Sequence, residues 1–188
     1  LMVEEKLSRE QFRYEQLEYI FHLDPMCLFN FLTCANKYTQ NINSNFKKTV
    51  KTPKHASMLL GMDNIKKCIG KLTTLKTIEN QAVAYKIEQL ACRSLHCAYQ
   101  ARHMARLLND KAEEEIFLSA LMMSLAELFI WFISPKKAQQ YELLIYTESM
   151  LEVDAQLEVF GFNFVDLMTH MRPQWRLPKL YIEALKTA

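Results

Sequence analysis

Four side chains that could bind a metal or act as nucleophile and base follow one another at helical spacing. Cys92, His96, Tyr99 and His103 stand at positions i, i+4, i+7 and i+11, which places them on one face of a helix. Sulfur and imidazole nitrogen are ligands that zinc prefers, and a cysteine near a histidine can form a catalytic dyad. No fourth ligand is visible in the sequence. We therefore expect an exposed polar stripe, with zinc binding as the alternative.

The other histidines carry no comparable pattern. No functional role is assigned to His22 or His55, and His170 is expected at a helix end beside Pro173. The chain has no P-loop, no G-x-G-x-x-G and no G-x-S-x-G motif. With 3 glycines in 188 residues, a phosphate-cradling loop is not expected.

Helix starts are marked by a capping residue followed by proline. Asp24-Pro25, Thr52-Pro53 and Ser134-Pro135 each place a side-chain oxygen before a residue that is tolerated at the first helical position. Gly61 is expected to end the second of these helices, and Asp63 to cap the next one. Three helices are thereby predicted.

Two capping boxes and one long periodic segment predict further helices. Ser8 with Gln11 predicts a helix through about His22, and Asp110 with Glu113 predicts another at the head of an apolar segment. Residues 82–108 repeat apolar or small side chains at helical spacing, and no segment alternates with a period of two. The face expected to pack closely against another helix carries Ser94, Ala98, Ala101 and Ala105. The predicted fold class is all-α.

The apolar segment from Phe117 to Phe132 raises the question of a membrane span. Its length is borderline, Glu127 lies inside it, three glutamates precede it and Pro135 ends it. A buried central helix is the better interpretation.

Composition indicates a folded domain without a linker. The chain is 50% hydrophobic and 23% charged, with no low-complexity run or repeat, so residues 1–188 are expected to form one domain. A start at Leu1 rather than Met is expected of a piece of a longer protein, with residues 1–23 as an N-terminal helix. Five cysteines without a CxxC pair suggest reduced, mostly buried thiols and a cytoplasmic location. No signal peptide is visible.

Charge is distributed unevenly along the chain. Residues 47–76 hold eight lysines and one acid, whereas residues 138–171 hold six acids and no Lys or Arg. The lysines are Lys47, Lys48, Lys51, Lys54, Lys66, Lys67, Lys71 and Lys76. These runs are either solvated faces or functional surfaces: an anion site, or patches for self-association or docking. Lysine without arginine does not favour sequence-specific nucleic-acid recognition.

Five segments, in this order, carry a family resemblance: DPMCLFNFLTCANKY (24–38), KTPKHASMLLGMDNI (51–65), RSLHCAYQARHMA (93–105), FLSALMMSLAEL (117–128) and EVFGFNFVDLMTHMRPQWRLP (158–178). Together they resemble the HDOD (HD-related output) domains of bacterial signalling proteins. The resemblance implies an all-helical bundle related to HD-type metal phosphohydrolases, together with a regulatory role.

The resemblance also places the hydrolases' metal centre on this chain. Arg93 stands for the first histidine, Met123 and Ser124 for the His-Asp pair, and Phe164 for a later histidine. None of these is a suitable ligand for a hydrolytic metal, so no metal, cofactor or catalytic residue is expected there. Glu127 is expected to pair with a base, for which Arg93 is the candidate.

Three functions remain open from the sequence. The favoured one is a non-catalytic regulatory domain that binds signalling proteins or neighbouring domains. The second is a degenerate phosphohydrolase with other ligands, for example His96 and His103. The third is an anionic nucleotide-binding module that uses the lysine-rich run, with Lys66 and Lys67 as its test residues.

Overall fold

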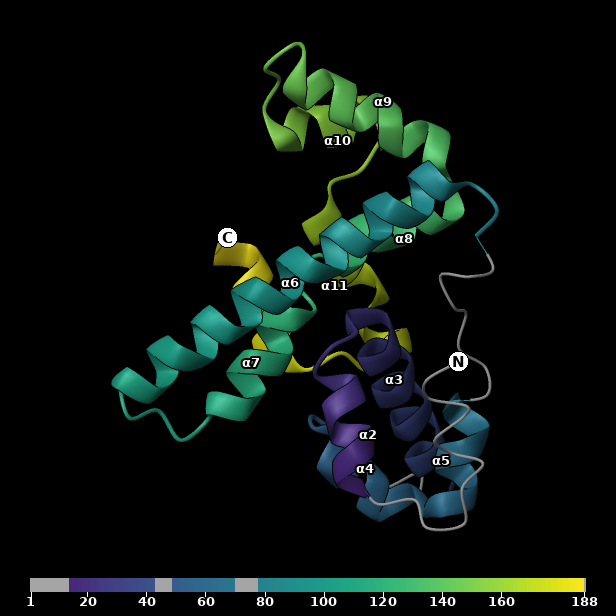
Figure 1. Ribbon diagram of the computed structural model, residues 1–188, viewed down its shortest axis with the longest axis vertical. Helices are drawn as coiled ribbons and strands as arrows, with labels where there is room; N and C mark the ends of the chain where they lie inside the picture. The colour runs from purple at the N-terminus through teal and green to yellow at the C-terminus, as the bar shows by residue number, and fades with distance from the viewer. Residues whose placement is uncertain (1–13, 43–48, 70–77, 188) are drawn as a thin grey trace.

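The computed structural model describes residues 14–42, 49–69 and 78–187, and all regular structure in these ranges is helical (Figure 1). The predicted all-α class is confirmed. The helices are α2 Tyr14–Phe21, α3 Pro25–Ile42, α4 Pro53–Leu60, α5 Met62–Ile69, α6 Gln81–Leu107, α7 Glu113–Leu121, α8 Leu125–Ile133, α9 Pro135–Tyr146, α10 Glu152–Phe160, α11 Phe164–Trp175 and α12 Lys179–Thr187.

The long helix α6 forms the spine of the molecule. It packs most extensively on α7 and also contacts α8. Helices α2 to α5 gather at one end of the longest axis, and α9 and α10 project at the other end (Figure 1). The two ends of the molecule are therefore built from different parts of the chain.

The three predicted proline starts are all helix starts. Asp24 Oδ1 accepts hydrogen bonds from the backbone N–H groups of Met26 and Cys27, both at 2.9 Å. Thr52 Oγ1 accepts the N–H of His55 at 3.3 Å. Ser134 precedes α9 but forms no side-chain cap bond. Proline's restricted backbone and the preceding residue thus set the start even where the cap bond is not made.

Three other helix boundaries were predicted within the described residues, at Gly61, Asp63 and Asp110, and only that at Gly61 was confirmed. Gly61 ends α4 with φ of 71°, a value that favours glycine. Asp63 lies in the first turn of α5 instead of preceding the helix. Helix α7 begins at Glu113 after Ala112, and Asp110 accepts the N–H of Ala112 at 2.8 Å, so the expected capping box does not form. The Ser8 capping box lies outside the described residues.

The apolar segment is two helices, so the prediction of a single central helix was wrong. Residues 122–124 form a turn between α7 and α8, in which the N–H of Met123 bonds to the carbonyl of Ala120 at 3.1 Å. The N–H of Leu125 bonds to the carbonyl of Met122 at 3.0 Å. These three-residue bonds tighten the chain and redirect it. An apolar sequence pattern cannot reveal such a turn because both halves are hydrophobic.

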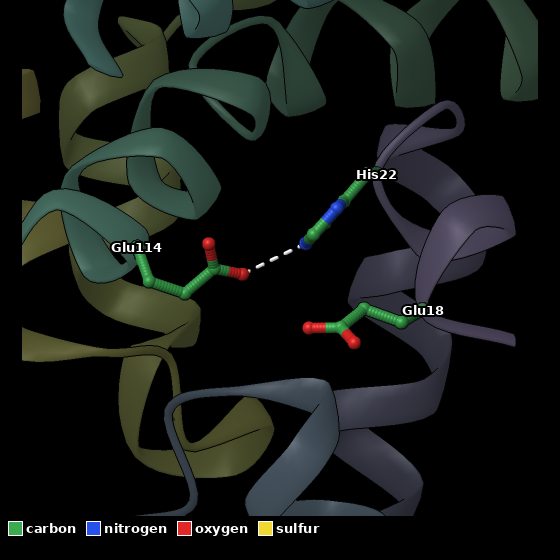
Figure 2. A group of neighbouring side chains, drawn as sticks. All are labelled: Glu18, His22 and Glu114. Carbon is green, nitrogen blue, oxygen red and sulfur yellow. Dashed lines mark hydrogen bonds and ion pairs between the residues drawn. The ribbon is translucent and has the colours of Figure 1, made fainter. Parts of the chain in front are cut away.

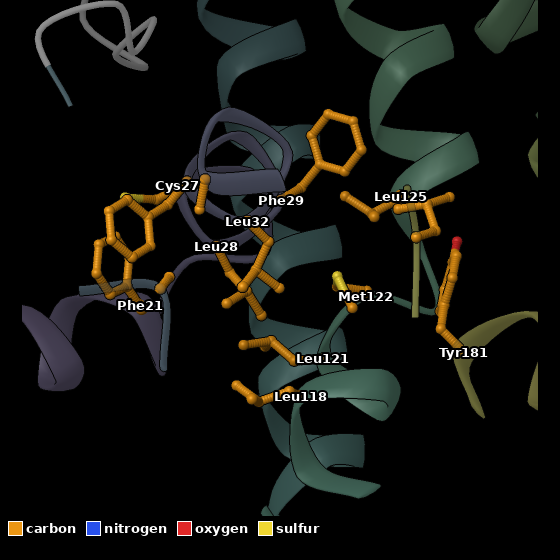
Figure 3. Packing of buried hydrophobic residues seen from close by; sticks show 14 of the residues in the cluster. Phe21, Cys27, Leu28, Phe29, Leu32, Leu118, Leu121, Met122, Leu125 and Tyr181 are labelled. Carbon is orange, nitrogen blue, oxygen red and sulfur yellow. The ribbon is translucent and has the colours of Figure 1, made fainter. Parts of the chain in front are cut away.

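Glu113–Ile133 is long and apolar enough to cross a membrane by length and composition, but half of its most apolar window is buried inside the protein. It supplies much of the main core (Figure 3). Leu118, Leu121, Met122 and Leu125 are each at most 1% exposed and pack with Leu28 and other residues of α3. This burial is typical of a core segment, which supports the expected interpretation.

The small-residue face of α6 packs as predicted. Ser94, Ala98 and Ala105 are buried, and Ser94 Oγ donates to the carbonyl of Leu90 at 3.0 Å. Small side chains allow the two backbones to approach closely. This accounts for the extensive contact between α6 and α7.

The cysteine prediction was wrong. Cys34 of α3 and Cys68 of α5 form a disulfide, with Cα atoms 6.0 Å apart. Of the remaining three, Cys27 is buried while Cys92 and Cys97 are exposed. The sequence shows no CxxC pair because the partners are 34 residues apart and meet only through packing of α5 on α3.

Helices α9 and α10 form a satellite unit with its own small core. Tyr141, Ala155 and Val159 are buried together, separately from the main core. Gln156 ties this unit to α11, because its Oε1 accepts the N–H of Phe164 at 2.8 Å and its Nε2 donates to the Tyr141 hydroxyl at 3.4 Å. Among the contacts between described helices, α10 makes its main contact with α9.

Candidate functional site

The positions that resemble the HD metal centre are linked by an ion pair. Arg93 of α6 donates to the carboxylate of Glu127 of α8, as the sequence predicted. The Glu127 side chain is 17% exposed and that of Arg93 is 52% exposed. Burial raises the pKa of Glu127 above its ordinary value, even though the charges of Arg93 and Lys86 oppose this shift. The pair therefore lies at the rim of the core, with the carboxylate on the inner side.

A second ion pair lies beside the first. Lys86 of α6 pairs with Glu142 of α9, and both of these residues influence the pKa of Glu127. The Lys86 ammonium also lies 6.0 Å from the centre of the Trp131 ring. Two cations and two carboxylates therefore balance one another between α6, α8 and α9.

The remaining positions of the implied metal centre offer no ligand. Met123 lies in the turn between α7 and α8 and packs against the main core. Ser124 is the residue before α8 and makes no cap bond with its side chain. The Phe164 ring lies 5.5 Å from that of Tyr141 and 5.6 Å from that of Phe160, in an aromatic cluster. These positions carry packing groups where a hydrolase needs nitrogen and oxygen donors.

Tyr141 connects the aromatic cluster to the charged network. Burial raises the pKa of Tyr141 to about 12, and nearby carboxylates including Glu127 act in the same direction. The hydroxyl therefore stays protonated at neutral pH and serves as a hydrogen-bond partner of Gln156. It is unsuited to act as a general base.

The zinc-like stripe on α6 faces outward. Cys92, His96, Tyr99 and His103 are all exposed, as expected from their position opposite the small-residue face. His96 Nε2 accepts from Gln100 Nε2 at 3.0 Å, a contact within one helix. These four side chains do not form a group of metal-binding atoms within the described residues.

The described residues contain one group of three side chains with metal-binding atoms, and the sequence did not point to it. Glu18 and His22 of the α2 region and Glu114 of α7 bring one ligand atom each within 4.8 Å of the others (Figure 2). His22 Nε2 donates to Glu114 Oε1 at 2.7 Å, because an ionised carboxylate can only accept. Glu18 and His22 are four residues apart, a helical spacing that was a local signal for two of the three side chains. Glu114 is 92 residues from His22, so no local spacing could have revealed the third.

Cations already surround Glu114. Its second oxygen accepts from Arg102 of α6, and the Arg102 guanidinium lies 3.7 Å from the centre of the Phe117 ring. Burial pushes the pKa of Glu114 up, but the bond from His22 and the charges of His22 and Arg102 together hold it below its ordinary value. A metal would have to displace the His22–Glu114 bond.

The first turn of α7 is a connection point for several elements. Glu113 pairs with Arg106 at 2.7 Å and Glu115 with Lys51 at 2.9 Å, beside the Glu114 contacts. Carboxylates are favourable at a helix N-terminus. The three glutamates thus link α7 to α6, to α2 and to the segment before α4.

The lysine-rich run is only partly within the described residues. Lys51 is paired with Glu115, whereas Lys54, Lys66 and Lys67 are exposed. The other four lysines of the run lie outside the described ranges: Lys47, Lys48, Lys71 and Lys76. The acidic run lies on α9, α10 and the start of α11.

The fold and the site together define an all-helical domain with an apolar core and paired charges at the rim of that core. The profile of the HDOD domain family matches residues 3–188, so the chain belongs to the HDOD domain family. The resemblance seen in the sequence is thereby confirmed. Comparisons with curated proteins and with solved structures find no match.

Proposed function

We propose that this chain is a non-catalytic output domain of bacterial signal transduction that acts by binding a protein partner or a neighbouring domain. The observation that carries the proposal is the Arg93–Glu127 ion pair at the position of the family's metal centre. Membership of the HDOD family is consistent with an output role.

Electrostatics at this position disfavour a hydrolytic metal. Glu127 and Glu142 are each engaged with a cation, and a divalent ion would have to compete with Arg93 and Lys86 for them. Met123 and Phe164 supply no hard donor atoms. An ion that activates water would therefore lack suitable ligands at these two positions.

Two measurements on the purified, dialysed protein, prepared without a metal-binding tag, test the proposal. Total Fe, Mn, Ni and Zn is expected to be far below one ion per chain. Turnover of a general phosphodiester and of a cyclic dinucleotide, with Mn²⁺ added, is expected to equal that of Mn²⁺ in buffer. Turnover above that level that is lost in Arg93→Ala or Glu127→Gln would overturn the proposal.

One observation favours a second candidate, a degenerate metal-dependent phosphohydrolase. The Glu18, His22 and Glu114 group has the nitrogen and oxygen donors of an open catalytic metal site. This candidate requires a bound ion that disappears in His22→Ala. The double substitution of His96 and His103 by Ala is the matched test for the stripe on α6, where the loss of an ion would instead locate the site.

A further inference from the structure

The two ends of the longest axis carry surfaces of opposite charge. We call the exposed face of α4 and α5 with Lys54, Lys66 and Lys67 the basic end. We call the exposed face of α10 with Glu152, Asp154 and Glu158 the acidic end. Figure 1 shows α4 and α5 at one end of the molecule and α10 at the other. A single chain therefore cannot bring its own two ends together.

The basic end combines cations with exposed apolar side chains. Met58 is 74% exposed and Met62 is 40% exposed. Lys54 lies one helical turn before Met58, and Lys66 one turn after Met62, so each methionine neighbours a lysine. The three lysines of this end form no ion pair with another described residue.

The acidic end has the complementary composition. Val153 is 54% exposed and Leu157 is 47% exposed, one turn apart on α10. Asp154 and Glu158 form a parallel acidic row along the same helix. The acids Glu152, Asp154 and Glu158 form no ion pair with another described residue. Since α10 packs mainly on α9, its outer face is left uncovered.

We propose that the basic end of one chain binds the acidic end of a second copy, so that chains associate head to tail. Methionines would meet the Val153–Leu157 row while lysines meet the acidic row. Charge complementarity sets the orientation, and exposed apolar surface supplies the favourable burial. Both halves of the contact are present on one chain, which is why a second copy is the occupant that this surface fits.

The contact joins different surfaces, so it has no two-fold symmetry. A contact of this kind builds open filaments of molecules, unless the rotation between neighbouring molecules closes them into a ring. The inference is independent of the proposed function. A chain that stays monomeric could still be a non-catalytic output domain, and a chain that self-associates could still be an enzyme.

Sedimentation velocity over a wide concentration range at low salt tests the proposal. The wild-type weight-average mass is expected to rise above that of the monomer with increasing concentration, either continuously for open filaments or to a plateau for a closed ring, and to fall when salt is raised. A mass that stays monomeric throughout would overturn the proposal.

Charge reversal at each end provides the sharper test. The double variants Lys66→Glu/Lys67→Glu and Asp154→Lys/Glu158→Lys are each expected to weaken association by at least about tenfold, because like charges then face one another. All four sites are exposed, and circular dichroism verifies that the variants fold. The control Lys111→Glu/Lys186→Glu makes the same change in net charge as Lys66→Glu/Lys67→Glu at exposed positions elsewhere and should associate like the wild type.

A mixture of the two double variants decides between this contact and a general effect of charge. In the mixture, each junction again pairs an acidic surface with a basic one, so association is expected to return. Failure of the mixture to associate would overturn the proposal. So would a wild-type chain that stays monomeric while an added nucleotide binds saturably and loses affinity in Lys66→Glu/Lys67→Glu, which would assign the basic end to an anionic ligand.

Discussion

Two half-buried glutamates show how surroundings decide the effect of one residue type. Glu114 has a lowered pKa because His22 and Arg102 outweigh the effect of its burial. Glu127 has a raised pKa because burial outweighs Arg93 and Lys86. The ionised form is therefore favoured by folding at Glu114 and disfavoured at Glu127.

The first prediction follows from the opposite directions of these two pKa shifts. At pH 7, Glu114→Gln is expected to lower the free energy of unfolding by about 1 kcal/mol, because the Glu114 side chain is 37% exposed and its pairs are screened by water. Glu127→Gln is expected to be neutral or stabilising by about 0.5 kcal/mol, since the amide still accepts from Arg93. Urea unfolding measures both.

The pH dependence of the free energy of unfolding contributed by Glu114 is opposite in sign to that contributed by Glu127. The stability contributed by Glu114 is present above its unfolded pKa of 4.5 and is lost as pH falls through the lower folded value. The destabilisation caused by ionising the Glu127 carboxyl appears as pH rises through the raised pKa of Glu127 in the folded state. Both differences from the wild type should therefore shrink on acidification. Greater destabilisation by Glu127→Gln than by Glu114→Gln at pH 7 would contradict this assignment.

The second prediction concerns a fully buried amide. Asn36 of α3 accepts the N–H of Val50 at 2.7 Å and donates to the Val50 carbonyl at 3.2 Å. Asn36→Ala leaves both backbone groups buried without this partner, which should cost about 3 kcal/mol. Gln40→Ala, at an exposed position of the same helix, should change stability by less than about 0.5 kcal/mol. Equal effects in urea unfolding would argue against the structural role of Asn36.

At the scale of elements, the Cys34–Cys68 disulfide fixes α5 on α3. It closes a loop of 34 residues, and loop-closure entropy gives a stabilisation of at most about 4 kcal/mol for such a loop. Because the bridge joins two elements at the basic end, its reduction should loosen that end first.

The third prediction is a lower Tm, by roughly 10 °C or less, when reductant is added. Cys34→Ser is the matched control, because its Tm should not respond to reductant. Unfolding without reductant should expose three reactive thiols, those of Cys27, Cys92 and Cys97. Five reactive thiols under these conditions would show that the bridge is absent.

At the scale of the whole molecule, the apolar segment Glu113–Ile133 behaves as part of a core. Its first-turn glutamates pair with Arg106, Arg102, His22 and Lys51, and its apolar residues pack against α3 and α6. Removing it from these partners would leave charges and packing surfaces uncovered at once.

The fourth prediction is that the folded chain does not bind lipid vesicles. In a flotation assay with neutral vesicles, it should remain in the buffer fractions. A synthetic peptide of residues 113–133 is the control and should float, because it has the apolar content without the core that covers it. Flotation of the folded chain would contradict the assignment of this segment to the core.

The helical class, most helix starts and the family could be predicted from the sequence alone. These depend on local chemistry: Asp24 and Thr52 before prolines, Gly61 at a helix end, and small residues spaced along α6. The Arg93–Glu127 pair was also predictable, because the family resemblance aligned two positions that lie together in the HD fold.

Contacts between distant segments could be seen only in the folded molecule. The Cys34–Cys68 bridge and the His22–Glu114 bond join residues that are 34 and 92 positions apart, and such spacings carry no signal. The turn at Met123 is local, but it lies inside an apolar pattern that does not mark it. Packing of α5 on α3 brings the two cysteines together, and the approach of the α2 region to α7 brings His22 to Glu114. A local pattern contains no information about such packing. The same reason explains the two charged ends: the sequence showed two runs of charge, whereas the fold placed them at opposite ends of the molecule.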